Sequence, residues 1–100
     1  MASNKQILDT LSLELQKLIQ ADIKKKDLID TGALFRSIKV TAKEQGSKVS
    51  LDIIAEDYFE FVDNSYHILD DVTNSNQWQN ALETAISQII ENNIKGNKNN

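Results

Sequence analysis

Residues 38–55 read Ile-Lys-Val-Thr-Ala-Lys-Glu-Gln-Gly-Ser-Lys-Val-Ser-Leu-Asp-Ile-Ile-Ala. Apolar and polar residues alternate from Ile38 to Lys43 and again from Val49 to Ile53. This period of two is typical of strands with one buried face, and a short polar link containing Gly46 joins the two runs. The stretch therefore predicts an antiparallel β-hairpin, which is the centre of an expected α+β fold.

The segment before the hairpin predicts a long amphipathic helix. Its apolar residues recur at spacings of three and four, the pattern of one helix stripe: Ile7, Leu8, Leu11, Leu15, Leu18 and Ile19. Ser3 and Gln6 have the spacing of a capping box at the helix start. The run Lys24–Lys26 lies near the helix end, where the helix dipole favours cations.

A short helix is expected between this long helix and the hairpin. It covers residues 33–37, and either Asp30 or Thr31 can cap its first turn. Leu34 and Ile38 share one face of it. We therefore expect these two side chains to anchor the helix under the hairpin.

A second short helix, aromatic in character, is expected after the hairpin. Three of its apolar residues stand at positions i, i+3 and i+4: Tyr58, Phe61 and Val62. Phe59 points away from the face that they share. The polar stretch of residues 64–74 predicts a turn-rich loop, in which three alternating residues could also form a short strand: Tyr66, Ile68 and Val72.

The C-terminal segment predicts the second long amphipathic helix. Its stripe is wide and unbroken, and consists of Trp78, Ala81, Leu82, Ala85, Ile86, Ile89, Ile90 and Ile94. Asn76 with Gln79 supplies a possible cap, and Lys95–Gly96 is a stop signal. We expect the stripe to face both the hairpin and the first helix. Residues 1–96 then form a single α+β domain, and residues 97–100 form a disordered tail.

Composition limits the chemistry that this chain can carry. A chain of 100 residues supports one core, and the absence of cysteine excludes disulfides, thiolate zinc sites and cysteine nucleophiles. The net charge of −4 argues against an independent nucleic-acid-binding module. His67, with Asp70 or Asp71, is the one candidate for acid–base work. We expect no catalytic site, no metal site, no cofactor and no membrane segment.

An isolated hairpin leaves its strand edges unpaired, which favours pairing with a neighbouring copy of the chain. Four residues are candidates for a subunit interface: Arg36, Asp57, Phe59 and Glu60. Arg36 could pair with Asp57 or Glu60 of the next subunit, and the alternative is an exposed arginine. Phe59 would remain available to a neighbour.

Two segments, one on either side of the hairpin, carry a family resemblance. They read Ile29-Asp30-Thr31-Gly32-Ala33-Leu34-Phe35-Arg36-Ser37-Ile38 and Asp57-Tyr58-Phe59-Glu60-Phe61-Val62-Asp63-Asn64. The chain resembles the head–tail joining and tail-completion (neck) proteins of tailed double-stranded-DNA phages, the gene-product-ten-like group of the lambdoid long-tailed phages. The connection to the last helix departs from the family, because Asp63-Asn64-Ser65 replaces its glycine-containing string and the chain has no proline.

The resemblance implies a structural virion protein without enzymatic activity. Such a subunit assembles as a ring, a hexamer or alternatively a dodecamer, which joins head to tail and lets DNA pass transiently and without sequence preference. Its partners are other copies of itself, the phage portal or adaptor, and tail proteins. It is made in the bacterial host cytoplasm and resides at the head–tail junction of the virion. The alternative is a small non-enzymatic interaction or adaptor module that dimerises.

Overall fold

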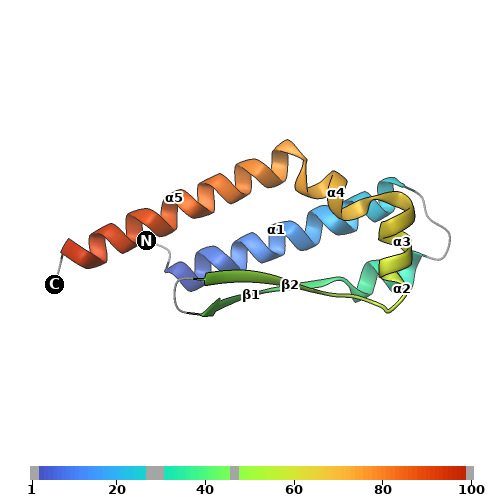
Figure 1. Cartoon of the computed structure of the whole chain (residues 1–100), viewed down its shortest axis with the longest axis horizontal. Coiled ribbons are helices and arrows are strands. Elements are labelled where there is room, and N and C mark those ends of the chain that lie inside the picture. The colour runs from blue at the N-terminus through green and yellow to red at the C-terminus, as the bar shows by residue number, and fades with distance from the viewer. Residues whose placement is uncertain (1–2, 27–30, 46–47, 99–100) are drawn as a thin grey trace.

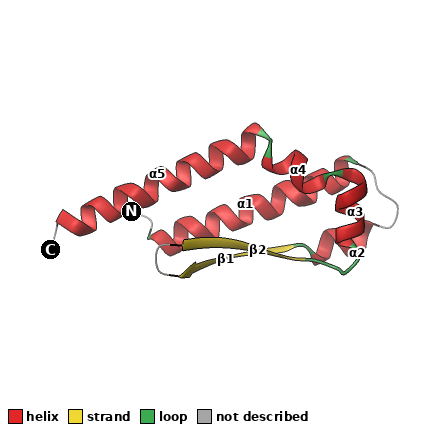
Figure 2. Cartoon of the chain, viewed as in Figure 1, coloured by secondary structure: helices red, strands yellow, loops and turns green. Residues whose placement is uncertain are grey.

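The computed structural model describes residues 3–26, 31–45 and 48–98. The elements follow in the order α1 (Asn4–Lys25), α2 (Thr31–Ser37), β1 (Lys39–Gln45), β2 (Lys48–Ile54), α3 (Phe59–Tyr66), α4 (Ile68–Thr73) and α5 (Asn76–Lys98). The long helices α1 and α5 and the sheet of β1 and β2 run along the molecule, and the short helices are grouped at one end (Figure 2). The predicted α+β class, with a long helix at each end of the chain, is confirmed.

α1 forms the middle layer of the molecule. In Figure 1, α5 lies along one side of it and the hairpin along the other. Its predicted stripe is buried, except for the partly buried Leu18, and Ile19 and Ile23 are fully enclosed. The predicted capping box is present, because the Ser3 hydroxyl accepts from the Gln6 N–H at 3.2 Å and the Gln6 side chain accepts from the Ser3 N–H at 2.9 Å. α1 therefore contributes the shared core of both layers.

α2 is anchored as its sequence predicts. Leu34 and Ile38 are buried in the core. The Gln20 side chain of α1 donates to the Phe35 carbonyl at 2.9 Å. At the helix end, the Ser37 hydroxyl accepts a hydrogen bond from the Glu56 N–H at 3.1 Å, which joins α2 to the chain just after β2. α2 begins at Thr31, so this residue lies within the helix rather than capping it, and Asp30, the other candidate cap, lies outside the described residues.

The hairpin is antiparallel and has the predicted alternation. Val40 lies opposite Ile53, and Ala42 lies opposite Leu51, so these side chains share the face toward α1. β1 packs directly on α1, where the Gln16 side-chain oxygen accepts from the Val40 N–H at 3.2 Å. β2 therefore forms the outer strand, and Leu51 and Ile53 pack against the edge of the core.

The predicted loop of residues 64–74 is wrong, because a helix, α4, occupies much of it. α3 ends at Tyr66, and the next residue, His67, turns the chain with a φ of 56° and a ψ of 44°, so that α4 starts directly after it. Ile68 and Val72, one helical turn apart, are buried. The same spacing is compatible with alternation in a strand, which is why the sequence pattern alone did not separate the two structures.

α5 differs from its prediction in three respects. Its cap is Ser75, whose hydroxyl accepts from the Trp78 N–H at 3.2 Å, rather than Asn76. It continues through the expected stop at Gly96 to Lys98, so part of the predicted tail of residues 97–100 is helical; residues 99–100 lie outside the described residues. α5 packs on α1 and α4, whereas the hairpin packs on the opposite side of α1. The expected packing of the α5 stripe against the hairpin is therefore wrong.

Candidate functional site

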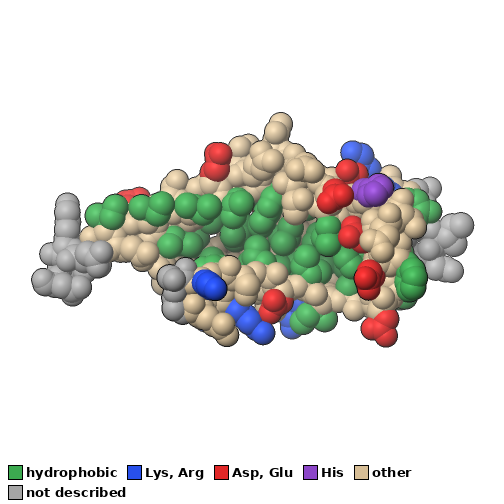
Figure 3. All heavy atoms as spheres, viewed as in Figure 1, with side chains coloured by type: hydrophobic (Ala, Val, Ile, Leu, Met, Phe, Trp, Pro, Cys, Tyr) green, Lys and Arg blue, Asp and Glu red, His purple; other side chains and the backbone are tan. Residues whose placement is uncertain are grey.

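The C-terminal half of α5 carries a row of exposed isoleucines. Ile86, Ile90 and Ile94 follow one another at intervals of one helical turn, and about half of each side chain is exposed. We call these three residues the α5 ridge. In Figure 3, hydrophobic side chains form a continuous band along α5 and into the surface below it. A contiguous apolar band, unlike scattered exposed residues, marks an interaction surface.

The opposite end of the molecule carries a second apolar surface. Tyr58, Phe61 and Tyr66 are exposed around α3, and Phe61 is 77% exposed. We call these three residues the aromatic end. The carboxylates of Glu56, Asp57 and Glu60 are also exposed in this segment. The aromatic end and the C-terminus of α5 lie at opposite ends of the long axis, which extends over 55 Å (Figure 1).

The prediction that Phe59 faces a neighbouring subunit is wrong. Its side chain is 9% exposed and belongs to the core cluster. α3 begins at Phe59, with Tyr58 at the N-cap position. This phase turns Phe59 and Val62 inward and leaves Phe61 outside. The predicted and observed faces of this short helix differ because three aromatic residues in four positions fit either phase.

The other three predicted interface residues are exposed. Asp57 and Glu60 flank the aromatic end, and Arg36 lies on α2. The Arg36 guanidinium folds back over Gly32, with Nη1 3.3 Å from the place where a Cβ would stand. Among the described residues, Arg36, Asp57 and Glu60 make no ion pair with one another. Pairing of Arg36 across a subunit boundary stays a prediction.

The sequence did not reveal that the α5 ridge is exposed, because its residues were assigned to the core. The available signal was the width of the stripe. Adjacent apolar pairs such as Ala85–Ile86 and Ile89–Ile90 spread it over more of the helix surface than one neighbouring helix covers. Ala85 is buried against the core and Ile89 is partly buried, while Ile86 and Ile90 are exposed.

The ionisable groups with the closest contacts are Lys26, Asp22 and Asp71, which form an ion-pair network between the end of α1 and α4. Lys26 Nζ contacts the Asp22 carboxylate and lies 2.7 Å from Asp71 Oδ2. Desolvation lowers the pKa of Lys26, but the hydrogen bonds and charges of Asp22 and Asp71 outweigh it and raise that pKa above its ordinary value. The hydrogen bond from Lys26 lowers the pKa of Asp71, against a smaller opposing effect of desolvation. The arrangement stabilises the junction of two helices.

His67, the candidate acid–base residue, lies on the surface. Its Nδ1 is 3.8 Å from Asp70 Oδ2, and both side chains are largely exposed. Asp71, the other candidate partner, is bound by Lys26 instead. In the described ranges, no three His, Cys, Asp or Glu side chains are grouped so that they could hold a metal ion.

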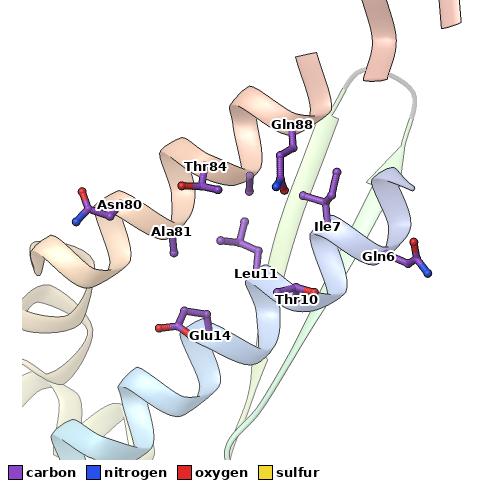
Figure 4. A pocket seen from close by; sticks show the side chains of 10 residues that line it. Gln6, Ile7, Thr10, Leu11, Glu14, Asn80, Ala81, Thr84 and Gln88 are labelled. Carbon is purple, nitrogen blue, oxygen red and sulfur yellow. The ribbon is translucent and has the colours of Figure 1, made fainter. Parts of the chain in front are cut away.

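A groove of about 470 Å³ lies between α1 and α5 (Figure 4). Ile7, Leu11, Ala81 and Ala85 form its apolar part, and the small alanines leave the space open. Its remaining lining is polar and comes from both helices: Gln6, Thr10, Glu14, Asn80, Thr84 and Gln88. The groove is shallow and carries a single charged side chain, so it offers little to fix a small polar ligand.

Comparison with family models, curated proteins and solved structures gave no match. In the part of the chain that the structure describes, no helix has the length and apolar character needed to span a membrane.

Proposed function

We propose that this chain is a non-enzymatic structural subunit that assembles into a ring at the head–tail junction of a tailed phage. One observation carries the assembly: two different apolar surfaces, the α5 ridge and the aromatic end, lie far apart on an elongated subunit. A ring requires a heterologous contact, in which one surface of a subunit binds a different surface of the next. The chain supplies one surface of each kind.

The two surfaces also differ in a way that suits such a contact. The α5 ridge is aliphatic and lies along a helix, whereas the aromatic end consists of exposed aromatic side chains around a short helix, beside carboxylates. Burial of a large aliphatic or aromatic side chain contributes about 1.5–3 kcal/mol when complete, and roughly half of that remains available where half is exposed. Three residues on each side are enough to bias association, and polar neighbours set its orientation.

The place in a phage neck rests on the family resemblance in residues 29–64, together with this assembly argument. In that setting the partners are the portal or adaptor on one side and tail proteins on the other. The excess of acidic residues, with a net charge of −4, is compatible with a channel through which DNA passes without being retained. The ring is a hexamer or a dodecamer, and it belongs to the virion.

The ring is tested by the oligomeric state of the purified chain and of three variants, using light scattering and negative-stain microscopy. The wild type is expected to form closed rings. Ile90→Asp and Phe61→Asp should each abolish the ring, because a heterologous contact needs both surfaces. Leu13→Asp is the matched control, since Leu13 is 52% exposed and Ile90 53%, but Leu13 belongs to neither surface.

An adaptor that dimerises through the α5 ridge gives a different pattern. The wild type is then a dimer, Ile90→Asp is a monomer, and Phe61→Asp remains a dimer. Rings that persist in both variants would refute the proposed contact. The neck location has its own test, because an antibody against the chain should label the head–tail junction of virions whose genome encodes it.

A further inference from the structure

We propose that the free edge of β2 pairs with β2 of a second copy, antiparallel and about a two-fold axis at Ser50. The two hairpins then form one four-stranded sheet. This contact is separate from the α5 ridge and the aromatic end, and it does not depend on the proposed ring.

The direction of the backbone N–H groups of β2 follows from a contact between β1 and α1. The Val40 N–H donates to the Gln16 side chain of α1, so it points out of the hairpin. In an antiparallel pair, directly opposite residues point their N–H groups the same way, either both inward or both outward, and the two arrangements alternate along the strands. Ile53 lies opposite Val40, so its N–H points outward as well. The same alternation turns the N–H groups of Leu51 and Val49 to the free edge.

The free edge of β2 is open and apolar. The sheet of the described residues contains β1 and β2 alone, so the outer side of β2 has no neighbouring strand. The side chains beside the edge groups are Val49, which is exposed, and Leu51 and Ile53, which are half-buried. An open edge with alternating apolar residues is a template for another strand. Proline, a common means of blocking such an edge, is absent from the chain.

The charges of β2 identify the occupant of its free edge as β2 of a second copy. With the two-fold axis at Ser50, Lys48 of each copy lies opposite Asp52 of the other, and Val49 lies opposite Leu51. Opposite charges that face one another across strands stabilise the pair, and the symmetry makes the contact twice. An axis at Leu51 would place Lys48 opposite Ile54, and an axis at Asp52 would place two aspartates opposite each other. The charges of β2 thus fit β2 itself, in one register.

Asp52 is available for this contact. Its carboxylate lies 3.1 Å from Lys43 Nζ of its own chain, and both side chains are substantially exposed. A surface pair of this kind contributes little and leaves room for a second cation. Lys48 has no ion pair within the described residues. In the paired sheet, Asp52 would lie between Lys43 of its own chain and Lys48 of the second copy.

Hydrogen exchange of the β2 amides tests the pairing without interference from the ring. In the wild type, exchange at Val49 and Leu51, which lie opposite each other across the two copies, should slow by about tenfold or more when the protein concentration rises about a hundredfold, because association protects amides that the single chain exposes. Rapid exchange of these amides at every protein concentration would overturn the proposal, even if rings form. The remaining occupant of the edge would then be an extended segment of another protein.

Charge exchange provides the second measurement. Lys48→Asp alone and Asp52→Lys alone place like charges opposite each other and should both restore rapid exchange. Mixed in equal amounts, the two variants form both ion pairs again and should regain the protection. Lys43→Ala is the control, because it removes the partner of Asp52 within the chain and keeps both members of the intermolecular pair. A mixture that exchanges as fast as its components contradicts the register.

Discussion

Lys26 and Asp71 are 45 positions apart in the sequence, and their side chains meet at 2.7 Å where α1 ends and α4 passes over it. The contact fixes the group of short helices against the core helix. It also connects the aromatic end, through α3 and α4, to α1, the helix on which α5 packs. The geometry between the two proposed assembly surfaces depends on this junction.

Replacement of Lys26 is expected to destabilise the chain more than replacement of Asp71. Lys26→Met leaves the poorly exposed Asp22 carboxylate without its partner, which costs about 1–3 kcal/mol. Asp71 is mostly exposed, so Asp71→Asn should cost clearly less than Lys26→Met. Urea unfolding measures both changes, and Lys17→Met on the exposed face of α1 is the control. Equal losses for the two variants would contradict the assigned burial.

The ion-pair network of Lys26 also predicts that stability depends on pH in the acidic and in the alkaline range. The pKa of Asp71 is lowered on folding, so its contribution is present above its usual value of 3.8 and is lost as the pH falls through the lower pKa of the folded state. The pKa of Lys26 is raised, so its contribution is present below 10.5 and is lost as the pH rises through the higher pKa of the folded state. Unfolding curves at acidic and alkaline pH should show both losses, and Lys26→Met should weaken both.

Leu34 is expected to be essential to the fold. Its side chain is 1% exposed, so Leu34→Ala should lower the free energy of unfolding by about 2–4 kcal/mol. Leu13→Ala, at a site that is mostly exposed, should stay within about 0.5 kcal/mol of the wild type. Chemical denaturation of both variants tests this contrast. A small loss for Leu34→Ala would show that α2 is not fixed to the core.

His67 should respond to substitution through its backbone. Its φ of 56° lies in the left-handed region, which costs roughly 1–2 kcal/mol for a residue with a Cβ. His67→Gly should therefore be neutral or raise stability by up to about 1 kcal/mol, since the flexibility of glycine in the unfolded chain offsets part of the gain. His67→Val should lower it by about 1 kcal/mol or more, because β-branched residues tolerate this region poorly. Thermal unfolding of the pair tests the assignment.

Proline substitutions at two successive positions of β2 should have different effects, because the N–H groups of these positions point to different edges of the strand. The N–H of Ser50 points toward β1, so Ser50→Pro removes a hydrogen bond of the hairpin and should disrupt it. The N–H of Val49 points to the free edge, so Val49→Pro should keep the hairpin and lose pairing with a second copy. Amide exchange of β1 residues reads out the first effect. If both variants keep the hairpin intact, the inferred alternation is wrong.

The elements with one buried face could be predicted from the sequence. The stripe of α1, the hairpin of residues 38–55 and the anchors Leu34 and Ile38 each fit a single period, and a packed neighbour covers each of them. Local patterns were ambiguous where two phases or periods fit equally well. Phe59 and Phe61 could exchange places, and the spacing of Ile68 and Val72 suits a helix as well as a strand.

The candidate surfaces were predictable only in part. The open edges of the hairpin follow from its having two strands. Exposure of the α5 ridge does not follow from the stripe itself, because an apolar stripe indicates that a surface is to be covered and does not say by which element. That depends on the position of α5 on the side of α1 away from the hairpin, a long-range arrangement that the period of the sequence does not encode.

The position of α1 between two layers also decides how the subunit responds to force. α5 is attached along α1, and near its C-terminal end Asn4 exchanges hydrogen bonds with Asn92 and Asn93, each 3.1 Å long. With the start of α1 held, a pull on the C-terminal end of α5 should load these few polar contacts first and peel α5 from α1 one turn at a time, because the hairpin lies on the opposite side of α1, outside the path of the force. The subunit should yield by progressive detachment of one helix before its sheet is strained.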